Sequence, residues 1–421
     1  MIQAECLTAA DRIGYQICRD AIWDAGYCNW MGWAPQVSDN SVTTYAWQSL
    51  GPTVYDGTAG IAWFLAQLAQ ATGSDIHRRT AIGACEHALK HHLDAGPRNA
   101  AGFFSGSLGC AVTALHVGGC LQIEKLRQAG LNLLKSSAHV AEELESDVIG
   151  GSAGAIPLLI GIGQQLGNQS LLDLPEGHAK RLLSLATRQL IERNEVWEMH
   201  WKSPAFERGL TGYSHGAAGF ANALLEIYYL FGGNAYLSAA REALTFERRR
   251  FNVEQQNWLD LRSEGEAPAV AGCAWCHGAA GIGLARLRTL ALLQDDPSIA
   301  NEIHTAMATT TQSLKSIAAP GTNLSLCHGH LGNIELILAA QEKNIEIQGG
   351  LGAVEDVINV VIAQSPTDIP WKCGTQDGRT TPGLMLGTAG IGSMFLRYSD
   401  SRYGIPLVLT PELVCATFGA L

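Results

Sequence analysis

The sequence predicts an all-α protein, a closed α/α toroid in which seven helical hairpins form an inner and an outer ring of helices. Three observations lead to this fold class. The pattern Gly-x-x-Gly followed by an apolar run occurs seven times, the copies lie 45–65 residues apart, and the apolar residues after each copy have helical rather than alternating spacing. Each interval has room for one helix, a return helix and their connections, so we expect the unit to be a helical hairpin.

The glycines mark where the inner helices are expected to begin. The pairs are Gly57/Gly60, Gly106/Gly109, Gly151/Gly154, Gly216/Gly219, Gly278/Gly281, Gly329/Gly332 and Gly387/Gly390. A residue without a side chain lets neighbouring helix starts approach closely, and it adopts backbone angles that other residues avoid. A single copy would be compatible with ordinary helix packing. Seven copies, each at the start of an apolar run, indicate a repeated architecture.

The segments between the apolar runs predict the outer helices. Residues Asn234–Glu247 and Ala300–Leu314 mix apolar and polar side chains, as helices with one solvated face do. Apolar inner helices paired with amphipathic outer ones favour a closed toroid over an open solenoid. We therefore expect one domain over residues 1–421, with the loops before the inner helices lining one rim.

Composition excludes several classes of function. The formal net charge of −11 argues against a nucleic-acid partner, because phosphates would be repelled over most of the surface. The N-terminus has no basic segment followed by an apolar run, and no stretch of about 20 uncharged apolar residues occurs, so we expect no transmembrane segment and a cytoplasmic location. The eleven cysteines are scattered through apolar segments, which is typical of small buried residues rather than of a disulfide framework.

Residues just before each first glycine should share one rim, because the repeats are equivalent. Immediately before that glycine stand Asp56, Ser105, Gly150, His215, His277, His328 and Leu386, and one position earlier stand Tyr55, Phe104, Ile149, Ser214, Cys276, Cys327 and Met385. Metal-ligand and proton-transfer side chains concentrate in the fourth to sixth repeats.

Two Cys-His-Gly tripeptides, beginning at Cys276 and Cys327, supply two thiols and up to two imidazoles from adjacent helix starts. Zinc prefers thiolate and imidazole ligands, and a catalytic zinc keeps three protein ligands and one exchangeable position. The positive end of a helix also favours thiolate over thiol. The pattern therefore predicts a Zn²⁺ site that ionises an incoming thiol and delivers nucleophilic sulfur.

The two tripeptides also match patterns other than a metal site. One isolated Cys-His pair would usually be a buried cysteine beside a hydrogen-bonded histidine, but two equivalent pairs favour a metal. Residues 273–277 match the haem-attachment pattern Cys-x-x-Cys-His, yet no export signal is present and haem would leave Cys327 unexplained. A redox pair of Cys273 and Cys276 lacks a thioredoxin-like strand pattern, so Cys273 is interpreted as a small packing residue.

Two further residues are candidates for proton transfer. His215 occupies the same register as His277 and His328 but has no cysteine before it, which suits a proton donor or acceptor. Asp147 lies four residues before Gly151, where it could orient an imidazole or cap a helix.

Together these motifs resemble the lanthionine synthetase C-like family over almost the whole chain. The resemblance rests on Tyr55-Asp56-Gly57-Thr58-Ala59-Gly60, Asp147 to Gly154, Ser214-His215-Gly216, Trp275-Cys276-His277-Gly278, Cys327-His328-Gly329 and Pro382 to Gly387. Residues 240–244 and 326–333 are most similar to the cyclase domain of bifunctional class II lanthipeptide synthetases.

The resemblance implies a double α/α barrel and thioether formation, in which a peptide cysteine adds to a dehydroalanine or dehydrobutyrine of a dehydrated precursor peptide. By motif match, the zinc ligands would be Cys276, Cys327 and His328, and the proton-handling pair His215 and Asp147. His277 could protonate the enolate.

Two departures from the family pattern limit what can be carried over. Some relatives have an arginine where Gly272 stands here, so a role of that arginine does not transfer. The chain also has no room for the dehydratase domain of the class II enzymes. It is either a stand-alone cyclase, served by a separate dehydratase, or a domain excised from a larger protein.

Three other functions were considered. A zinc prenyltransferase would need a basic mouth to bind diphosphate, and a toroid glycosidase would need paired carboxylates, whereas Asp56 and Asp147 lie in non-adjacent repeats. A zinc protein of the same family that binds or transfers glutathione, without cyclising peptides, is the main alternative.

Overall fold

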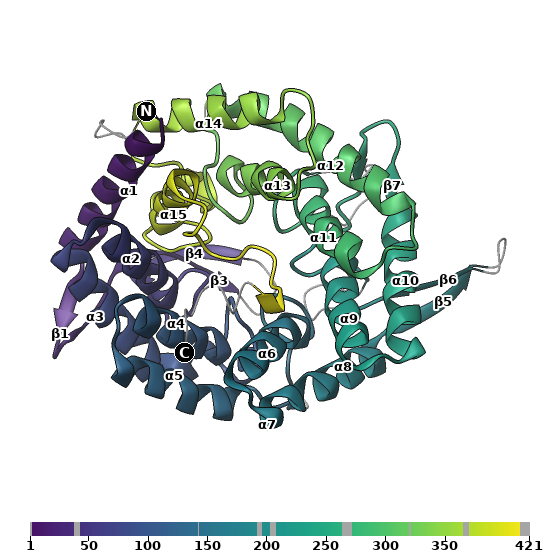
Figure 1. Ribbon diagram of the computed structural model, residues 1–421. Helices are drawn as coiled ribbons and strands as arrows, with labels where there is room; N and C mark the ends of the chain where they lie inside the picture. The colour runs from purple at the N-terminus through teal and green to yellow at the C-terminus, as the bar shows by residue number, and fades with distance from the viewer. Residues whose placement is uncertain are drawn as a thin grey trace.

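The computed structural model describes residues 2–37, 43–141, 143–191, 196–202, 208–262, 272–319, 321–364 and 370–412. Its helices form two concentric rings (Figure 1). The inner ring contains α2 (Thr58–Thr72), α4 (Ser107–Cys120), α6 (Ser152–Leu166), α9 (Ala217–Phe231), α11 (Ala279–Leu292), α13 (His330–Glu342) and α15 (Thr388–Ser399). The outer ring contains α1 (Ile2–Arg19), α3 (Asp75–His91), α5 (Glu124–Ser137), α8 (Leu174–Leu185), preceded by the short α7 (Gln169–Leu172), α10 (Asn234–Arg248), α12 (Ser298–Leu314) and α14 (Gly350–Gln364). The predicted all-α toroid is confirmed.

Glycine is required at the inner helix starts because backbones meet there. Each first glycine of the seven pairs is the residue directly before its inner helix. At each second glycine a Cβ atom would lie 1.8–2.2 Å from the carbonyl oxygen six residues earlier. Close approach therefore explains the motif, whereas a positive φ among the seven first glycines occurs only at Gly278 (φ 77°).

The two rings differ in burial as the sequence predicts. Residues of α2 and α6 are buried on every side over most of their length, whereas α10 buries one face, which includes Tyr236, Ala240 and Leu244. The seventh pair is assembled from distant parts of the chain, because α15 packs against α1 and also against α2. The contact between α15 and α2 closes the inner ring, and contacts of α1 with α14 and α3 close the outer ring.

In the described ranges, four short antiparallel hairpins lie in connections for which the sequence predicted no regular structure. They are β1 (Ile22–Asp24) with β2 (Tyr27–Asn29), β3 (Met31–Val37) with β4 (Thr43–Ser49), β5 (Thr187–Ile191) with β6 (Val196–His200), and β7 (Phe251–Asn252) with β8 (Asn257–Trp258). In the first, Ala25 and Gly26 both have positive φ, the geometry that matches strand twist in a two-residue turn. The β5–β6 hairpin projects away from the rings (Figure 1).

A closed circuit of backbone hydrogen bonds joins the loops before the inner helices, and we call it the rim ring. Its N–H to O=C bonds run from Tyr55 to Phe104 (2.7 Å), Phe104 to Ile149 (3.2 Å), Val148 to Ser214 (3.1 Å), Ser214 to Cys276 (3.1 Å), Cys276 to Cys327 (3.2 Å), Cys327 to Met385 (3.0 Å) and Met385 back to Tyr55 (2.7 Å). Only the step at Val148 and Ile149 shifts by one residue. The circuit shows that the toroid is closed and that equivalent positions of the repeats share one rim.

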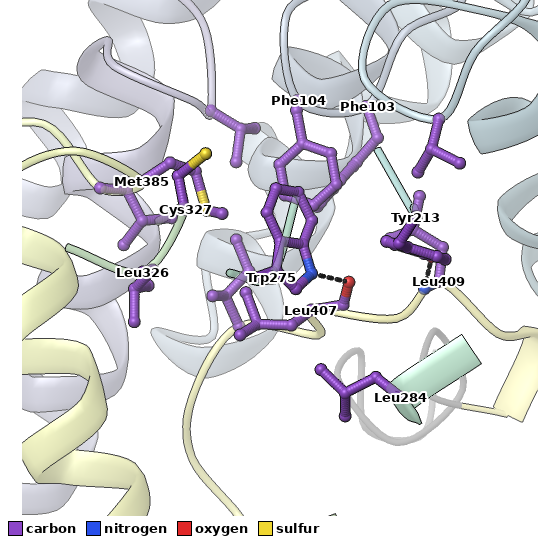
Figure 2. Packing of buried hydrophobic residues seen from close by; sticks show 14 of the residues in the cluster. Phe103, Phe104, Tyr213, Trp275, Leu284, Leu326, Cys327, Met385, Leu407 and Leu409 are labelled. Carbon is purple, nitrogen blue, oxygen red and sulfur yellow. Dashed lines mark hydrogen bonds between the residues drawn. The ribbon is translucent and has the colours of Figure 1, made fainter. Parts of the chain in front are cut away.

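The segment after α15, residues 400–412, passes across the barrel and packs beneath the rim (Figures 1 and 2). The indole N–H of Trp275 donates to the Leu407 carbonyl at 2.8 Å, and the Leu409 N–H donates to the Tyr213 hydroxyl at 2.8 Å. Leu407 and Leu409 are buried in the same apolar cluster as Phe104. This segment therefore packs against Trp275 and Tyr213, which directly precede the rim residues Cys276 and Ser214 in the sequence. In the part of the chain that the structure describes, every helix is too short or too polar to cross a membrane.

Candidate metal centre

Cys276, Cys327 and His328 converge at one side of the rim. One ligand atom from each lies within 4.8 Å of the other two. The two cysteines come from the loops before α11 and α13 and are adjacent members of the rim ring, which places their side chains together. Both cysteines are buried, whereas His328 is exposed. The cluster thus has a closed side made by the barrel and an open side at the mouth.

The protonation of the two thiols favours a bound cation. The hydrogen bond with Cys327 and burial raise the pKa of Cys276, whereas that same contact lowers the pKa of Cys327 against the effect of burial. The Tyr55 hydroxyl, 2.9 Å from the Cys327 sulfur, adds to the lowering. The pair therefore accommodates one negative charge readily and a second only with difficulty. A divalent cation would compensate both thiolates, so this donor set fits a metal ion.

His215 and Asp147 form a hydrogen-bonded pair on the same rim. The Nδ1 atom of His215 lies 2.5 Å from Asp147 Oδ2, and Asp147 Oδ1 accepts a hydrogen bond from the Gly150 N–H at 2.8 Å. Of the two roles considered from the sequence, the aspartate contacts the imidazole; its bond to Gly150 lies in the turn before α6 and is not a helix cap. Burial lowers the pKa of His215, but the charge and hydrogen bond of Asp147 outweigh burial and raise it. The imidazole remains 40% exposed to the mouth.

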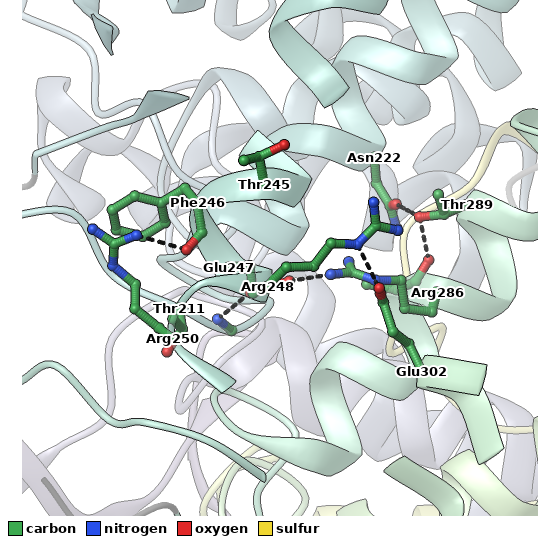
Figure 3. A network of polar contacts seen from close by, with 12 residues as sticks. Thr211, Asn222, Thr245, Phe246, Glu247, Arg248, Arg250, Arg286, Thr289 and Glu302 are labelled. Carbon is green, nitrogen blue, oxygen red and sulfur yellow. Dashed lines mark hydrogen bonds and ion pairs between the residues drawn. The ribbon is translucent and has the colours of Figure 1, made fainter. Parts of the chain in front are cut away.

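A buried polar network fixes the loop that carries His215 (Figure 3). Glu247 accepts a hydrogen bond from the Gly212 N–H at 2.8 Å and pairs with Arg286 at 2.7 Å, and both side chains of that pair are fully buried. Arg286 also pairs with Glu302 on α12. The network links the loop to α10, α11 and α12, so the position of His215 is tied to the frame of the barrel.

His277 lies beside the cluster but is not one of its three converging residues. Its Nδ1 atom is 3.0 Å from the Cys276 sulfur, and its side chain is 16% exposed. It also contacts Arg262 and Asp260, which no sequence motif indicated because they lie in the connection after β8. The Tyr55 hydroxyl was missed as well, although its position on the rim was a signal that could have found it.

Cys273 is separate from the cluster. Its sulfur lies 3.6 Å from the Thr310 hydroxyl of α12, and it is a free thiol, as are Cys276 and the other cysteines in the described ranges. Most of these cysteines are buried, as the sequence predicts. The geometry therefore favours Cys273 as a packing residue over a redox partner of Cys276.

The fold and the site define an α/α barrel in which two cysteines and a histidine converge at one rim. The chain belongs to the lanthionine synthetase C-like protein family, whose family model matches residues 48–408. The resemblance seen in the sequence motifs is thereby confirmed.

Individual relatives agree with this assignment. The lacticin 481/lactococcin biosynthesis protein LcnDR2 of Lactococcus lactis subsp. lactis is 24% identical over 254 residues, which are 58% of this chain and 24% of the relative. The chain thus matches a minor part of that protein's length. Among solved structures, nisin cyclase is similar, with a TM-score of 0.60 and 19% identity over 87% of this chain and 93% of its own. At this identity the likeness shows the fold.

Proposed function

We propose that this protein is a zinc-dependent peptide cyclase of the cytoplasm that forms lanthionine and methyllanthionine rings. The reaction would add a cysteine thiol to a dehydroalanine or dehydrobutyrine of the same precursor peptide. The observation that carries the proposal is the convergence of Cys276, Cys327 and His328 on an open side of the rim that also bears His215. Family membership supports the same reaction class.

Zinc would be held by Cys276, Cys327 and His328 and, when bound, would supply the Lewis acidity that lowers the pKa of an entering thiol. The two ligand cysteines sit at the N-termini of α11 and α13, where the helix dipoles favour negative sulfur. Because barrel residues bury both sulfurs, the substrate must approach from the side of His328.

Ring closure needs one proton removed from sulfur and one delivered to carbon. The new bond joins sulfur to Cβ, the π electrons of the double bond move toward the neighbouring carbonyl, and Cα is then protonated. Asp147 raises the pKa of His215 and so favours its protonated form, which suits a donor to Cα. His277, beside Cys276, is the alternative donor.

The unsaturated peptide must come from another catalyst. Dehydration of serine and threonine is a different reaction, and the described residues of this chain form one rim with one metal-ligand cluster. We therefore propose a separate dehydratase, or a dehydratase domain of a larger protein, as the partner that supplies the substrate.

The direct test combines recombinant chain with a predehydrated peptide and then treats the mixture with a thiol-alkylating reagent. Cyclisation leaves the peptide mass unchanged and removes its free thiols, so the product should resist alkylation. Peptide that remains fully alkylated, in the presence of zinc-loaded protein, would contradict the proposal.

Glutathione binding is the second candidate function, because the exposed side of the cluster is open to any small thiol. A glutathione-binding assay run in parallel separates the two. Zinc-loaded protein that binds glutathione and leaves dehydrated peptides untouched would favour this alternative.

A further inference from the structure

Arg262 reaches the metal centre from a part of the chain that carries no rim motif. It lies in the connection after β8, and its Nη2 atom is 2.8 Å from Nδ1 and 2.7 Å from Nε2 of His277. The guanidinium therefore lies against the imidazole ring that adjoins Cys276. Its side chain is 36% exposed, so part of it is open to solvent.

Asp260 holds this guanidinium in a fixed orientation. Its two carboxylate oxygens accept hydrogen bonds from Nε (3.0 Å) and Nη2 (2.7 Å) of Arg262, and Oδ1 also accepts from the backbone N–H of Arg262 at 3.0 Å. Such a bidentate ion pair fixes the plane of the guanidinium as well as its position. The cation is thus placed in advance and need not reorganise when negative charge forms nearby.

The charge of Arg262 acts on both halves of the site. Its charge acts on both Cys276 and Cys327, and the pKa of Arg262 is raised by Asp260 and by these thiols in spite of burial. The same charge also acts on His215. A cation whose charge acts on the metal-ligand cysteines and on the proton-transfer histidine can stabilise negative charge that forms near them.

Gly272 leaves room for the imidazole that Arg262 contacts. A Cβ atom at Gly272 would lie 2.7 Å from Nε2 of His277. A side chain at Gly272 would therefore displace the His277 ring from beside Arg262. The combination of a glycine at 272 and an arginine at 262 leaves room for both the imidazole and the guanidinium beside Cys276.

We propose that Arg262 is a catalytic residue that binds the carbonyl oxygen of the dehydroalanine or dehydrobutyrine under attack. This inference rests on the cyclase function proposed above. As the S–Cβ bond forms and the C=C π bond breaks, the electron pair moves onto that oxygen, giving an enolate that the guanidinium stabilises. Protonation of Cα then restores the carbonyl, and the proton that left sulfur balances the one that carbon gains. Asp260 is a positioning residue for Arg262.

The test uses the zinc-loaded full chain and a predehydrated peptide. Arg262→Ala should lower kcat by about 10²–10³-fold, the loss seen when one donor to a developing oxyanion is removed. Zinc content should stay unchanged. Arg262→Lys should restore little, because it lacks the fork that Asp260 holds, and Asp260→Asn should lose roughly 10-fold. Added guanidinium ion, below denaturing concentrations, should recover activity in Arg262→Ala alone.

A binding measurement tests the contact without turnover. The probe is a peptide that keeps dehydroalanine but has its cysteines replaced by alanine, compared with the same peptide in which dehydroalanine is also alanine. Arg262→Ala should weaken binding of the first peptide by about fivefold or more and weaken binding of the second less, because a saturated residue does not hold its carbonyl oxygen in the plane of a C=C bond. Equal binding of the first peptide by wild type and variant, or an unchanged kcat, would overturn the proposal.

Arg402→Ala is the matched control. Arg402 pairs with Asp400 through the same Asp-x-Arg arrangement, including the backbone N–H bond, but on an exposed turn after α15. It should match wild type in both assays. Wild-type protein that cannot cyclise the peptide would refute the cyclase function itself, whereas active wild type with a fully active Arg262→Ala variant would refute only the role of Arg262.

Discussion

The rim positions of the second and fifth repeats have the same backbone and different chemistry. Phe104 and Cys276 both take part in the rim ring, and both are buried. Phe104 packs its ring against Trp275, with ring centroids 5.2 Å apart, whereas Cys276 offers a sulfur to the metal-ligand cluster. The comparison teaches that glycines and backbone hydrogen bonds build the barrel, and that one side chain per repeat decides whether a rim position serves packing or chemistry.

The largest predicted effect comes from removing a ligand. Cys276→Ala should lose bound zinc and reduce cyclisation by on the order of 100-fold or more, because two remaining ligands no longer hold the ion in place. Zinc content by elemental analysis and cyclisation of a predehydrated peptide provide the measurements.

Two variants test the comparison between the second and the fifth repeat. Phe104→Leu should retain zinc and lose about 1–2 kcal/mol of unfolding free energy, because it changes only packing. Cys273→Ala should retain both zinc and activity. If Cys276→Ala kept a full equivalent of zinc, the assignment of the fifth repeat to metal binding would be wrong.

The glycines should be sensitive wherever backbones meet. Gly281→Ala places a Cβ 1.9 Å from the Trp275 carbonyl oxygen, so we expect a loss of about 3 kcal/mol or more in unfolding free energy. Gly352→Ala, in outer helix α14, meets nothing within 4 Å and should gain up to about 1 kcal/mol from helix propensity. Denaturant titration of both variants gives the comparison, and equal losses would contradict the close-approach explanation.

The pair of His215 and Asp147 should respond to pH. Because the folded state raises the pKa of His215 above its usual value near 6.5, the stability that the pair contributes is full below about pH 6.5 and is lost as pH rises through the folded pKa. Asp147→Asn should therefore destabilise more at about pH 6 than at about pH 9. The cyclisation activity of Asp147→Asn should fall roughly 10-fold below that of wild type.

The pH dependence of activity separates the roles of the two histidines. If protonated His215 is the donor, activity declines as pH rises through its pKa, and Asp147→Asn should move that decline to lower pH. His277→Ala should leave its position unchanged. A pH profile of kcat that is identical in wild type and Asp147→Asn would exclude His215 as the donor.

A moderate loss of stability is predicted for the segment beneath the rim. Tyr213→Phe removes the hydroxyl that accepts the Leu409 N–H, and an unpaired buried N–H costs about 1–2 kcal/mol. Zinc content should not change. A denaturation midpoint equal to that of wild type would show that the contact with Leu409 adds nothing to stability.

Much of the fold was predictable because it depends on local pattern. The seven Gly-x-x-Gly pairs located every inner helix start, and mixed polarity located outer helices such as α10 and α12. Short hairpins such as β1–β2 were not predicted, because a few alternating residues around a turn give a weak periodic signal. The pairing of α15 with α1 depends on ring closure, which no local pattern encodes.

The candidate site was predictable to the extent that it repeats. Cys276, Cys327 and His328 were found because equivalent repeat positions must be neighbours, and the structure brings them within one cluster. Arg262 was missed because it lies outside the rim positions, in a connection that carries no repeated sequence motif. The roles of the cluster residues and of His215, Asp147 and His277 stay predictions until the variants above are measured. The assignment of the whole chain to one domain also stays a prediction.

The contact between α1 and α15 has a consequence for how the molecule folds. These helices are separated by almost the entire described sequence, so their association closes a very long loop and carries a large share of the contact order. During translation, six hairpins can stack as an open crescent while α1 exposes its apolar face. The crescent becomes a ring only when α15 emerges, and until then the apolar face of α1 that α15 covers is open to chaperones and to mispairing between chains.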